Sequence, residues 1–347
     1  MRHEYRMSAD DSSGGASDIH GARELSQVEL GTGLRGRFLH NEPMKKYVSW
    51  RAGGLAQRVY IPADLDDLCW LVRSLPLDEP IHVLGLGSNL LVRDGGVKGV
   101  AILLHGVLKK LAIESRLNGL PSGDPHSMLV YAEAGVASPK LARFCANQNL
   151  VGGEFWAGIP GTVGGALAMN AGCYGHETWE KVAQVLTLNR NGKLHERRTE
   201  DYVTGYRHVA LKPPVSPLAG SLPNSTEEWF IGAWFRLPKG DGVASRASIK
   251  NLLQKRIASQ PLQLPNAGSV FRNPPGDFAA RLIESCELKG YRIGGAQVSE
   301  KHANFIVNVG NASASDIERL IEHVETVVEA RTQVRLQREV RIIGERI

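Results

Sequence analysis

The 347-residue chain has few of the features that mark several protein classes. Its four cysteines stand far apart and form no CxxC pair, which disfavours a disulfide framework and a structural zinc site. No apolar stretch approaches the roughly 20 residues that a membrane helix needs. The N-terminus also lacks the apolar core of a secretory signal. We therefore expect a cytoplasmic protein with reduced thiols and no membrane association.

Basic clusters and metal-binding patterns are missing as well. The net charge is +5 and the isoelectric point about 9.0, but no Lys/Arg run or basic stripe with interleaved aromatics is present. No histidines have metal-ligand spacing, so we expect no metal. The mild positive excess instead suits anionic small ligands such as nucleotides, and no nucleic-acid partner is expected.

Length and composition predict a soluble globular chain of two or three domains. Residues 1–40 are polar and rich in Ser, Gly, Asp and His, so we predict a disordered extension, with Met7 and Met44 as alternative starts. A composition change near 240–242 separates a part at 41–240, with subdomains 41–110 and 111–240, from a part at 241–347.

Hydrophobic periodicity predicts a mixture of helices and strands. Ser138 followed by Pro139 indicates an N-cap and first helical position. At the C-terminus, alternation predicts one long strand, with Glu339 and Arg341 on the face opposite the apolar residues. The expected helices cover 64–75, 138–147, 244–258, 276–287 and 313–332; the expected strands cover 81–84, 100–104, 128–132, 182–188, 229–237, 303–309 and 334–343; a Pro- and Ser-rich loop covers 213–226.

Two glycine-rich loops are candidates for binding a phosphate or a large flat ligand. Residues 85–89 follow a buried strand, but Leu90 replaces the third glycine of GxGxxG and no clear helix follows, which disfavours a Rossmann site. Alone, this loop fits a structural turn equally well. Residues 158–165, followed closely by the Gly-containing run 170–175, are a stronger signal, and the Walker pattern is absent.

Three polar residues in the second half are ordinary singly but informative together. Arg207 by itself suits a solvated surface, Ser269 a small-residue turn, and Glu339 an exposed strand edge. Ser269 does not lie in a GxSxG nucleophile elbow. As a set, a hydroxyl that gives a proton, a guanidinium that holds a carboxylate and a carboxyl that shares charge suit reduction of an enol ether acid.

Many motifs occur in a fixed order over about residues 40–347: 49–54, 85–89, 158–161, 170–172, 206–207, 267–271, 288–290, 293–296, 302–305 and 339–344. In this series the chain closely resembles the UDP-N-acetylenolpyruvoylglucosamine reductase family. The resemblance implies an α+β fold: a two-part FAD-binding domain of the p-cresol methylhydroxylase/vanillyl-alcohol oxidase type at 41–240 and a C-terminal α/β substrate-binding domain at 241–347. It also implies non-covalent FAD, NADPH as hydride donor and the shorter subtype of the family.

The resemblance further implies residue roles. Arg207 would bind the substrate carboxylate, Ser269 would give the proton, and Glu339 would handle charge with a raised pKa. The implied cofactor contacts are Gly85, Gly87, Ser88, Asn89, Gly158, Gly161, Gly164, Gly165, Gly172 and Arg341. The implied substrate contacts are Tyr174, Arg272, Asn273, Lys289 and His302.

Two alternatives remain at this point. One is an oxidase or dehydrogenase of the same FAD fold that acts on an alcohol or sugar. The other is a UDP-sugar-binding regulator without catalysis. The reductase reading requires small-molecule substrates and no obligate protein partner.

Overall fold

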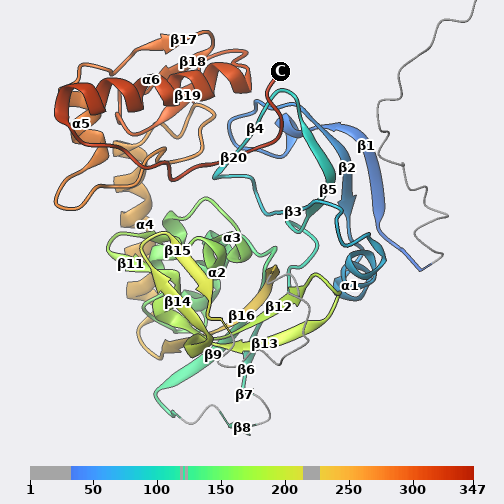
Figure 1. The fold of residues 1–347 in the computed structure, drawn as a ribbon. Coiled ribbons are helices and arrows are strands. Elements are labelled where there is room, and N and C mark those ends of the chain that lie inside the picture. Colours follow the sequence, from blue (N-terminus) through green and yellow to red (C-terminus); the bar gives the residue numbers. More distant parts are fainter. Residues whose placement is uncertain (1–32, 118–119, 122–123, 214–226) are drawn as a thin grey trace, which may run out of the picture.

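The structure, a computed structural model, describes residues 33–117, 120–121, 124–213 and 227–347. Its elements form three groups that follow one another along the chain (Figure 1). Residues 1–32 and most of the loop expected at 213–226 lie outside the described residues. No helix of the described part is long and apolar enough to cross a membrane.

The first group is a sheet of strand order β1-β2-β5-β3, on which α1 packs. Asp64 caps α1 by accepting from the Asp67 amide, and the expected helix and strands of this region are confirmed. β3 runs directly into the glycine loop at 85–89. The elements are β1 (Arg37–Pro43), η1 (Met44–Lys46), β2 (Leu55–Ile61), α1 (Leu65–Ser74), β3 (Ile81–Leu84), β4 (Leu90–Val92) and β5 (Val97–Leu103).

Ordered structure begins earlier than the sequence predicted. β1 occupies residues 37–43 and pairs antiparallel with β2, so disorder through residue 40 is wrong for its last four positions. Phe38 explains this, because its ring lies 4.6 Å from that of buried Tyr60. A neighbouring strand and an aromatic contact offset the polar composition of the segment.

The second group is an antiparallel sheet of order β13-β12-β16-β9-β6, with α2 and α3 in the core on one of its faces. Its strand predictions are confirmed within two residues. The elements are β6 (Leu111–Glu114), β7 (Arg116–Leu117), β8 (Leu120–Pro121), β9 (Ser127–Glu133), α2 (Ser138–Asn147), η2 (Glu154–Gly158), α3 (Val163–Ala168), β10 (Gly172–Cys173), β11 (His176–Glu177), η3 (Thr178–Lys181), β12 (Val182–Asn189), β13 (Leu194–Arg198), η4 (Thr199–Asp201), β14 (Tyr202–Gly205), β15 (His208–Leu211) and β16 (Glu228–Pro238).

The predicted cap of α2 is wrong by one position. Ala137 is the N-cap, with no side-chain hydrogen bond, and Ser138 is already helical and fully buried. Gly161 takes over part of the capping, because its carbonyl accepts from the Ser138 amide. The start of α2 is thereby tied to the second glycine loop.

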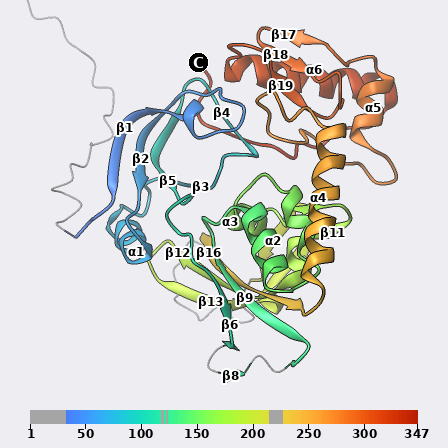
Figure 2. The ribbon, with the colours of Figure 1, turned by 180° about the vertical axis from the view of Figure 1, so that it is seen from behind.

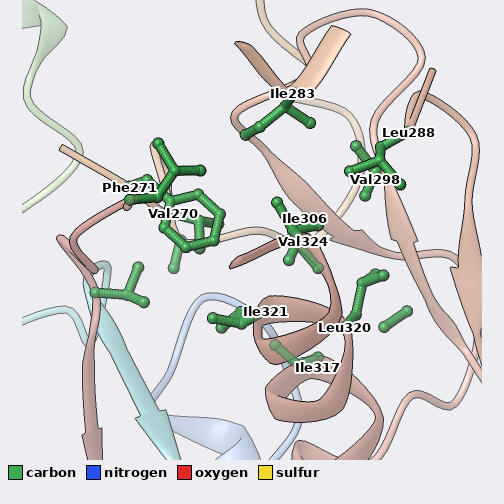
Figure 3. Packing of buried hydrophobic residues seen from close by; sticks show 14 of the residues in the cluster. Val270, Phe271, Ile283, Leu288, Val298, Ile306, Ile317, Leu320, Ile321 and Val324 are labelled. Carbon is green, nitrogen blue, oxygen red and sulfur yellow. The ribbon is translucent and has the colours of Figure 1, made fainter. Parts of the chain in front are cut away.

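The third group contains α4, α5, α6 and a sheet of order β17-β18-β19. α4 extends alongside the second group towards the third (Figures 1 and 2). Ser313 and Asp316 form a capping box at the start of α6, whose apolar face packs on β18, β19 and the 270–271 segment (Figure 3). The elements are α4 (Gly242–Ser259), α5 (Ala279–Ser285), β17 (Arg292–Ile293), β18 (Ala296–Val298), β19 (Ile306–Asn308), α6 (Ala314–Thr332) and β20 (Arg341–Ile343).

Two elements of this group are shorter than predicted. α5 begins at Ala279 rather than 276, because Gly276 has φ +76° and the Asp277 amide closes a turn on Pro274. β19 begins at Ile306 rather than 303, because the Phe305 amide bonds the His302 carbonyl in a turn.

The long C-terminal strand is the largest error in the secondary structure. Only Arg341–Ile343 forms a strand, β20, and it pairs parallel with β4 of the first group. Residues 334–340 follow the surface of the third group instead, with Leu336 and Val340 buried in its core. The chain end therefore crosses from one group to another (Figure 1), a long-range pairing that alternation cannot reveal.

Candidate active site

The two glycine loops meet around one cavity. Its volume is about 370 Å³, and it lies between the loop after β3 and the loop before α3. Residues of the third group and the chain end complete the wall. Of the implied cofactor contacts, those lining it are Gly85, Gly87, Ser88, Asn89, Gly158, Gly161, Gly165, Gly172 and Arg341.

The two loops can approach each other closely because glycine has no side chain. A Cβ on Gly85 would lie 2.2 Å from the Thr162 hydroxyl oxygen, and one on Gly161 would lie 3.3 Å from the Ser88 hydroxyl oxygen. Among the described residues, none accepts a hydrogen bond from the amides of Gly87, Ser88 or Gly161. A wall of glycine backbone with free donors fits the phosphates and flat rings of FAD.

Gly164 does not belong to this wall. Its amide donates to the Ala134 carbonyl, and a Cβ would meet the Ala134 methyl at 2.8 Å. Gly164 therefore allows α3 to pack closely on the end of β9 and does not line the cavity.

A second cavity of about 520 Å³ adjoins the first. Arg207, Ser269 and Glu339 line both, as do Gly172 and Cys173. The three residues that looked ordinary singly in the sequence thus meet where the two cavities join. A ligand in the second cavity would contact them and a cofactor in the first.

Arg207 reaches this junction from a hairpin turn. β14 and β15 are joined through Tyr206 and Arg207, and Arg207 has φ +54°, a conformation that non-glycine residues seldom adopt. Buried Asn170 stabilises the turn, because its side-chain amide donates to the Gly205 carbonyl at 3.0 Å and to Glu177 at 2.7 Å. Asn170 also accepts from the Trp179 amide, so one side chain connects three segments.

Backbone pairing brings Ser269 and Glu339 to the same place. The Glu339 amide donates to the Val270 carbonyl at 2.8 Å, and the Arg272 amide donates to the Gln337 carbonyl, also at 2.8 Å. Residues 337–340 thereby run beside residues 270–272 like a short strand pair. This is why Glu339 faces a cavity rather than solvent.

Arg207 and Glu339 form a largely desolvated ion pair. Nε of Arg207 lies 2.7 Å from Oε1 of Glu339, and the two side chains are 16% and 11% exposed. The angle at Nε is poor for a hydrogen bond, so the contact is mainly coulombic. Burial raises the pKa of the Glu339 carboxyl, and the opposing effect of Arg207 does not fully offset it.

The implied substrate residues divide into two sets. Tyr174 and Asn273 line the second cavity, and Arg272 donates to the Arg207 carbonyl at 3.3 Å. Arg272 itself, like Lys289 and His302, lines neither cavity. Lys289 instead pairs with Glu284 at 2.8 Å, and the His302 ring packs against Phe305, which does line the first cavity.

Sequence reasoning missed three side chains at the site. Cys173 lines both cavities, Asn304 lines the second, and Arg256 lines the first. Arg256 binds Gln260 through Nε, and within the described chain no carboxylate pairs with it. Burial lowers its pKa, so an anionic ligand would stabilise its charge. The only sequence feature that could have pointed to Arg256 was its place at the basic end of a helix, just before Gln260 and Pro261.

The comparisons with known proteins agree with this geometry. Residues 56–197 match the model of an FAD-binding domain, so the fold and the glycine-walled cavity define an FAD-dependent oxidoreductase. Residues 260–343 match the model described as the C-terminal domain of UDP-N-acetylenolpyruvoylglucosamine reductase. The chain belongs to the UDP-N-acetylenolpyruvoylglucosamine reductase family.

Relatives of that name cover all or most of the chain. A UDP-N-acetylenolpyruvoylglucosamine reductase of Thiobacillus denitrificans is 68% identical over 348 residues, which is 100% of both chains. One of Nitrosospira multiformis is 58% identical, covering 92% of this chain and 93% of the relative. The crystal structure of the reductase from Thermus caldophilus matches with a TM-score of 0.68 at 28% identity, over 89% of this chain and 99% of that one. The predicted α+β fold with an FAD-binding part is thereby confirmed.

Proposed function

We propose that this chain reduces UDP-N-acetylglucosamine enolpyruvate to UDP-N-acetylmuramate, a step in bacterial peptidoglycan precursor synthesis. NADPH is the hydride donor and non-covalent FAD the carrier. The observation that carries the proposal is the meeting of Arg207, Ser269 and Glu339 where the two cavities join. Family membership over the full chain supports the same reaction. We place the enzyme in the cytoplasm, without an obligate protein partner, nucleic acid or membrane.

The glycine loops at 85–89 and 158–165 would hold FAD, which would supply the terminal carbon of the enolpyruvyl group with hydride taken from NADPH. Negative charge then grows on the adjacent carbon and its carboxylate. Arg207 holds that carboxylate: Glu339 occupies its Nε side, and no described side chain pairs with its two terminal nitrogens. The guanidinium is thus oriented by one carboxylate and free to bind another.

Ser269 and Glu339 complete the reaction. The Ser269 hydroxyl gives its proton to the carbanionic carbon, so that hydride and proton together reduce the double bond. Glu339, with a raised pKa, shares a proton or hydrogen bond with the developing charge without adding a full negative charge. Tyr174, Arg272 and Asn273 hold the remainder of the sugar nucleotide.

The two parts of the chain have different proposed roles. Residues 41–240 hold FAD, with subdomains 41–110 and 111–240, and residues 241–347 supply the substrate side. The arrangement of the cavities supports this, because both glycine loops belong to the first part and both Ser269 and Glu339 to the second. Arg207 is the one member of the trio that the first part contributes.

An anaerobic titration tests the function. Purified protein should show the yellow flavin spectrum, bleach with NADPH and recover when UDP-N-acetylglucosamine enolpyruvate is added. Recovery only with oxygen or another acceptor would indicate an oxidase or dehydrogenase of the same fold. A colourless protein that binds the sugar nucleotide would indicate a regulator.

A further inference from the structure

Asn304 is a buried polar residue directly beside the segment that carries Ser269. It precedes β19 and is 3% exposed. Its side-chain amide donates to the Phe271 carbonyl at 2.8 Å, and its side-chain oxygen accepts from the Phe271 amide at 3.0 Å. Its own carbonyl accepts from the Val270 amide at 2.9 Å. One residue therefore satisfies three of the four polar groups of the 270–271 backbone.

These hydrogen bonds complement those that residues 337–340 make to the same segment. The Val270 carbonyl accepts from the Glu339 amide, while the Val270 amide donates to Asn304. The Val270 and Phe271 side chains are buried in the core of the third group, and this burial fixes where the segment lies (Figure 3). The hydrogen bonds fix how its peptide planes are turned, and that orientation sets the direction of the adjoining Ser269.

The chemistry of the asparagine side chain is specific to this task. A carboxamide offers a donor and an acceptor together to one backbone residue, as a neighbouring strand would, and does so without titrating. A buried amide or carbonyl left without a partner is costly, so the 270–271 backbone would turn if Asn304 were shortened. A displacement of this kind by about 1 Å can cost about 100-fold in rate.

We propose that Asn304 is a positioning residue for proton transfer, which holds Ser269 at the junction of the two cavities. The inference rests on the proposed function of Ser269. It predicts that loss of Asn304 slows the step that needs the Ser269 proton and leaves the first half-reaction intact.

The test uses the full holoenzyme carrying Asn304→Ala or the near-isosteric Asn304→Asp, measured at a pH at which the carboxyl is ionised and cannot donate to the Phe271 carbonyl. With each variant, flavin reduction by NADPH should stay within about 2-fold of the unmodified protein. The limiting rate of flavin reoxidation by saturating enolpyruvyl substrate should fall about 10- to 100-fold. The solvent deuterium isotope effect on that step should rise, because proton transfer limits it more fully.

Asn308 provides the matched control. It is 8% exposed, donates to the Trp50 carbonyl and accepts from the Gly310 and Ala312 amides, but lines neither cavity. Asn308→Ala should lower thermal stability without separating the two half-reactions. If it separated them as Asn304→Ala does, the effect would be general loosening of the fold and the proposal would be wrong.

A double-variant cycle decides whether Asn304 acts through Ser269. In the Ser269→Ala background, Asn304→Ala should lower the residual reoxidation rate by less than about 3-fold. Full multiplicative losses would overturn the proposal, as would an equal slowing of both half-reactions or a rise in substrate Kd alone. If Asn304→Ala failed to fold, the near-isosteric Asn304→Asp would carry the same comparison. If the reduced flavin of the unmodified protein were not reoxidised by this substrate, the proposed function itself would be wrong.

Discussion

Nε of Arg207 lies 2.7 Å from Oε1 of Glu339, although one residue sits in a hairpin of the second group and the other near the chain end. Both side chains are mostly buried, so neither charge is well solvated. The pair therefore orients a cation towards the cavity, and burial keeps the pKa of the Glu339 carboxyl raised although Arg207 acts to lower it.

Removal of the Ser269 hydroxyl should affect only the second half-reaction. We expect Ser269→Ala to retain FAD and its reduction by NADPH, and to lose at least about 100-fold in reoxidation by the enolpyruvyl substrate. Stopped-flow flavin absorbance follows both steps in one instrument. Normal reoxidation would contradict the assignment of Ser269 as proton donor.

Truncation of Arg207 should raise substrate KM and lower kcat together, because charge on the carboxylate grows in the transition state. We expect Arg207→Ala to reduce kcat/KM by about 100- to 1000-fold. Arg207→Lys keeps the charge but loses the planar fork, so it should recover only part of that loss. An unchanged kcat at saturation would limit Arg207 to ground-state binding.

The raised pKa of Glu339 predicts an alkaline limb in the rate of the second half-reaction. The carboxyl keeps its proton at pH values above the ordinary glutamate range near 4.3 and loses it as pH rises through the raised folded pKa. Activity that depends on the proton should fall through the same window. Glu339→Gln should be slower and should lack that limb; the same limb in the variant would assign it to another group.

A methyl group at Gly85 should weaken FAD binding. The added Cβ would overlap the Thr162 hydroxyl and force the two glycine loops apart. We expect Gly85→Ala to purify with at least about 10-fold less flavin by the ratio of visible to ultraviolet absorbance. Gly106→Ala is a control for backbone strain alone, because Gly106 has φ +80°, an open Cβ position and no place in either cavity wall. Equal flavin loss in both variants would show that loop closure is not the cause.

Glu318 should make stability fall at acid pH. It is 5% exposed, and Arg93 binds it through two nitrogens at 2.9 Å each, linking α6 to the residue after β4. That contact, together with a hydrogen bond from Arg346 at 2.7 Å, lowers the pKa of Glu318 to about 2. Its stabilisation is fully present above the unfolded pKa near 4.3 and is lost as pH falls through about 2.

Glu318→Gln should therefore lower the free energy of unfolding by about 3 kcal/mol at pH 7. The difference between the two proteins should shrink as pH falls from about 5 towards 2. Urea unfolding at several pH values measures it. A difference that did not change with pH would mean that packing rather than charge is responsible.

The sequence by itself determined the local elements and the kinds of chemistry available. Periodicity predicted α1 and α6 to within a few residues, because helices with one apolar face are encoded locally. The glycine density predicted loops that a ligand approaches closely. The ordered motifs indicated the family, and the types of the three catalytic candidates indicated reduction of an enol ether acid.

Tertiary structure alone decided which residues meet. Alternation predicted one strand at 334–343, whereas residues 337–340 pair with 270–272 and only 341–343 joins β4. That switch turns Glu339 from an exposed edge into the partner of Arg207. Likewise Gly164 and Lys289 are residue types that suit ligand binding but lie outside both cavities. Such outcomes depend on contacts between distant segments, whose free energy no local pattern records.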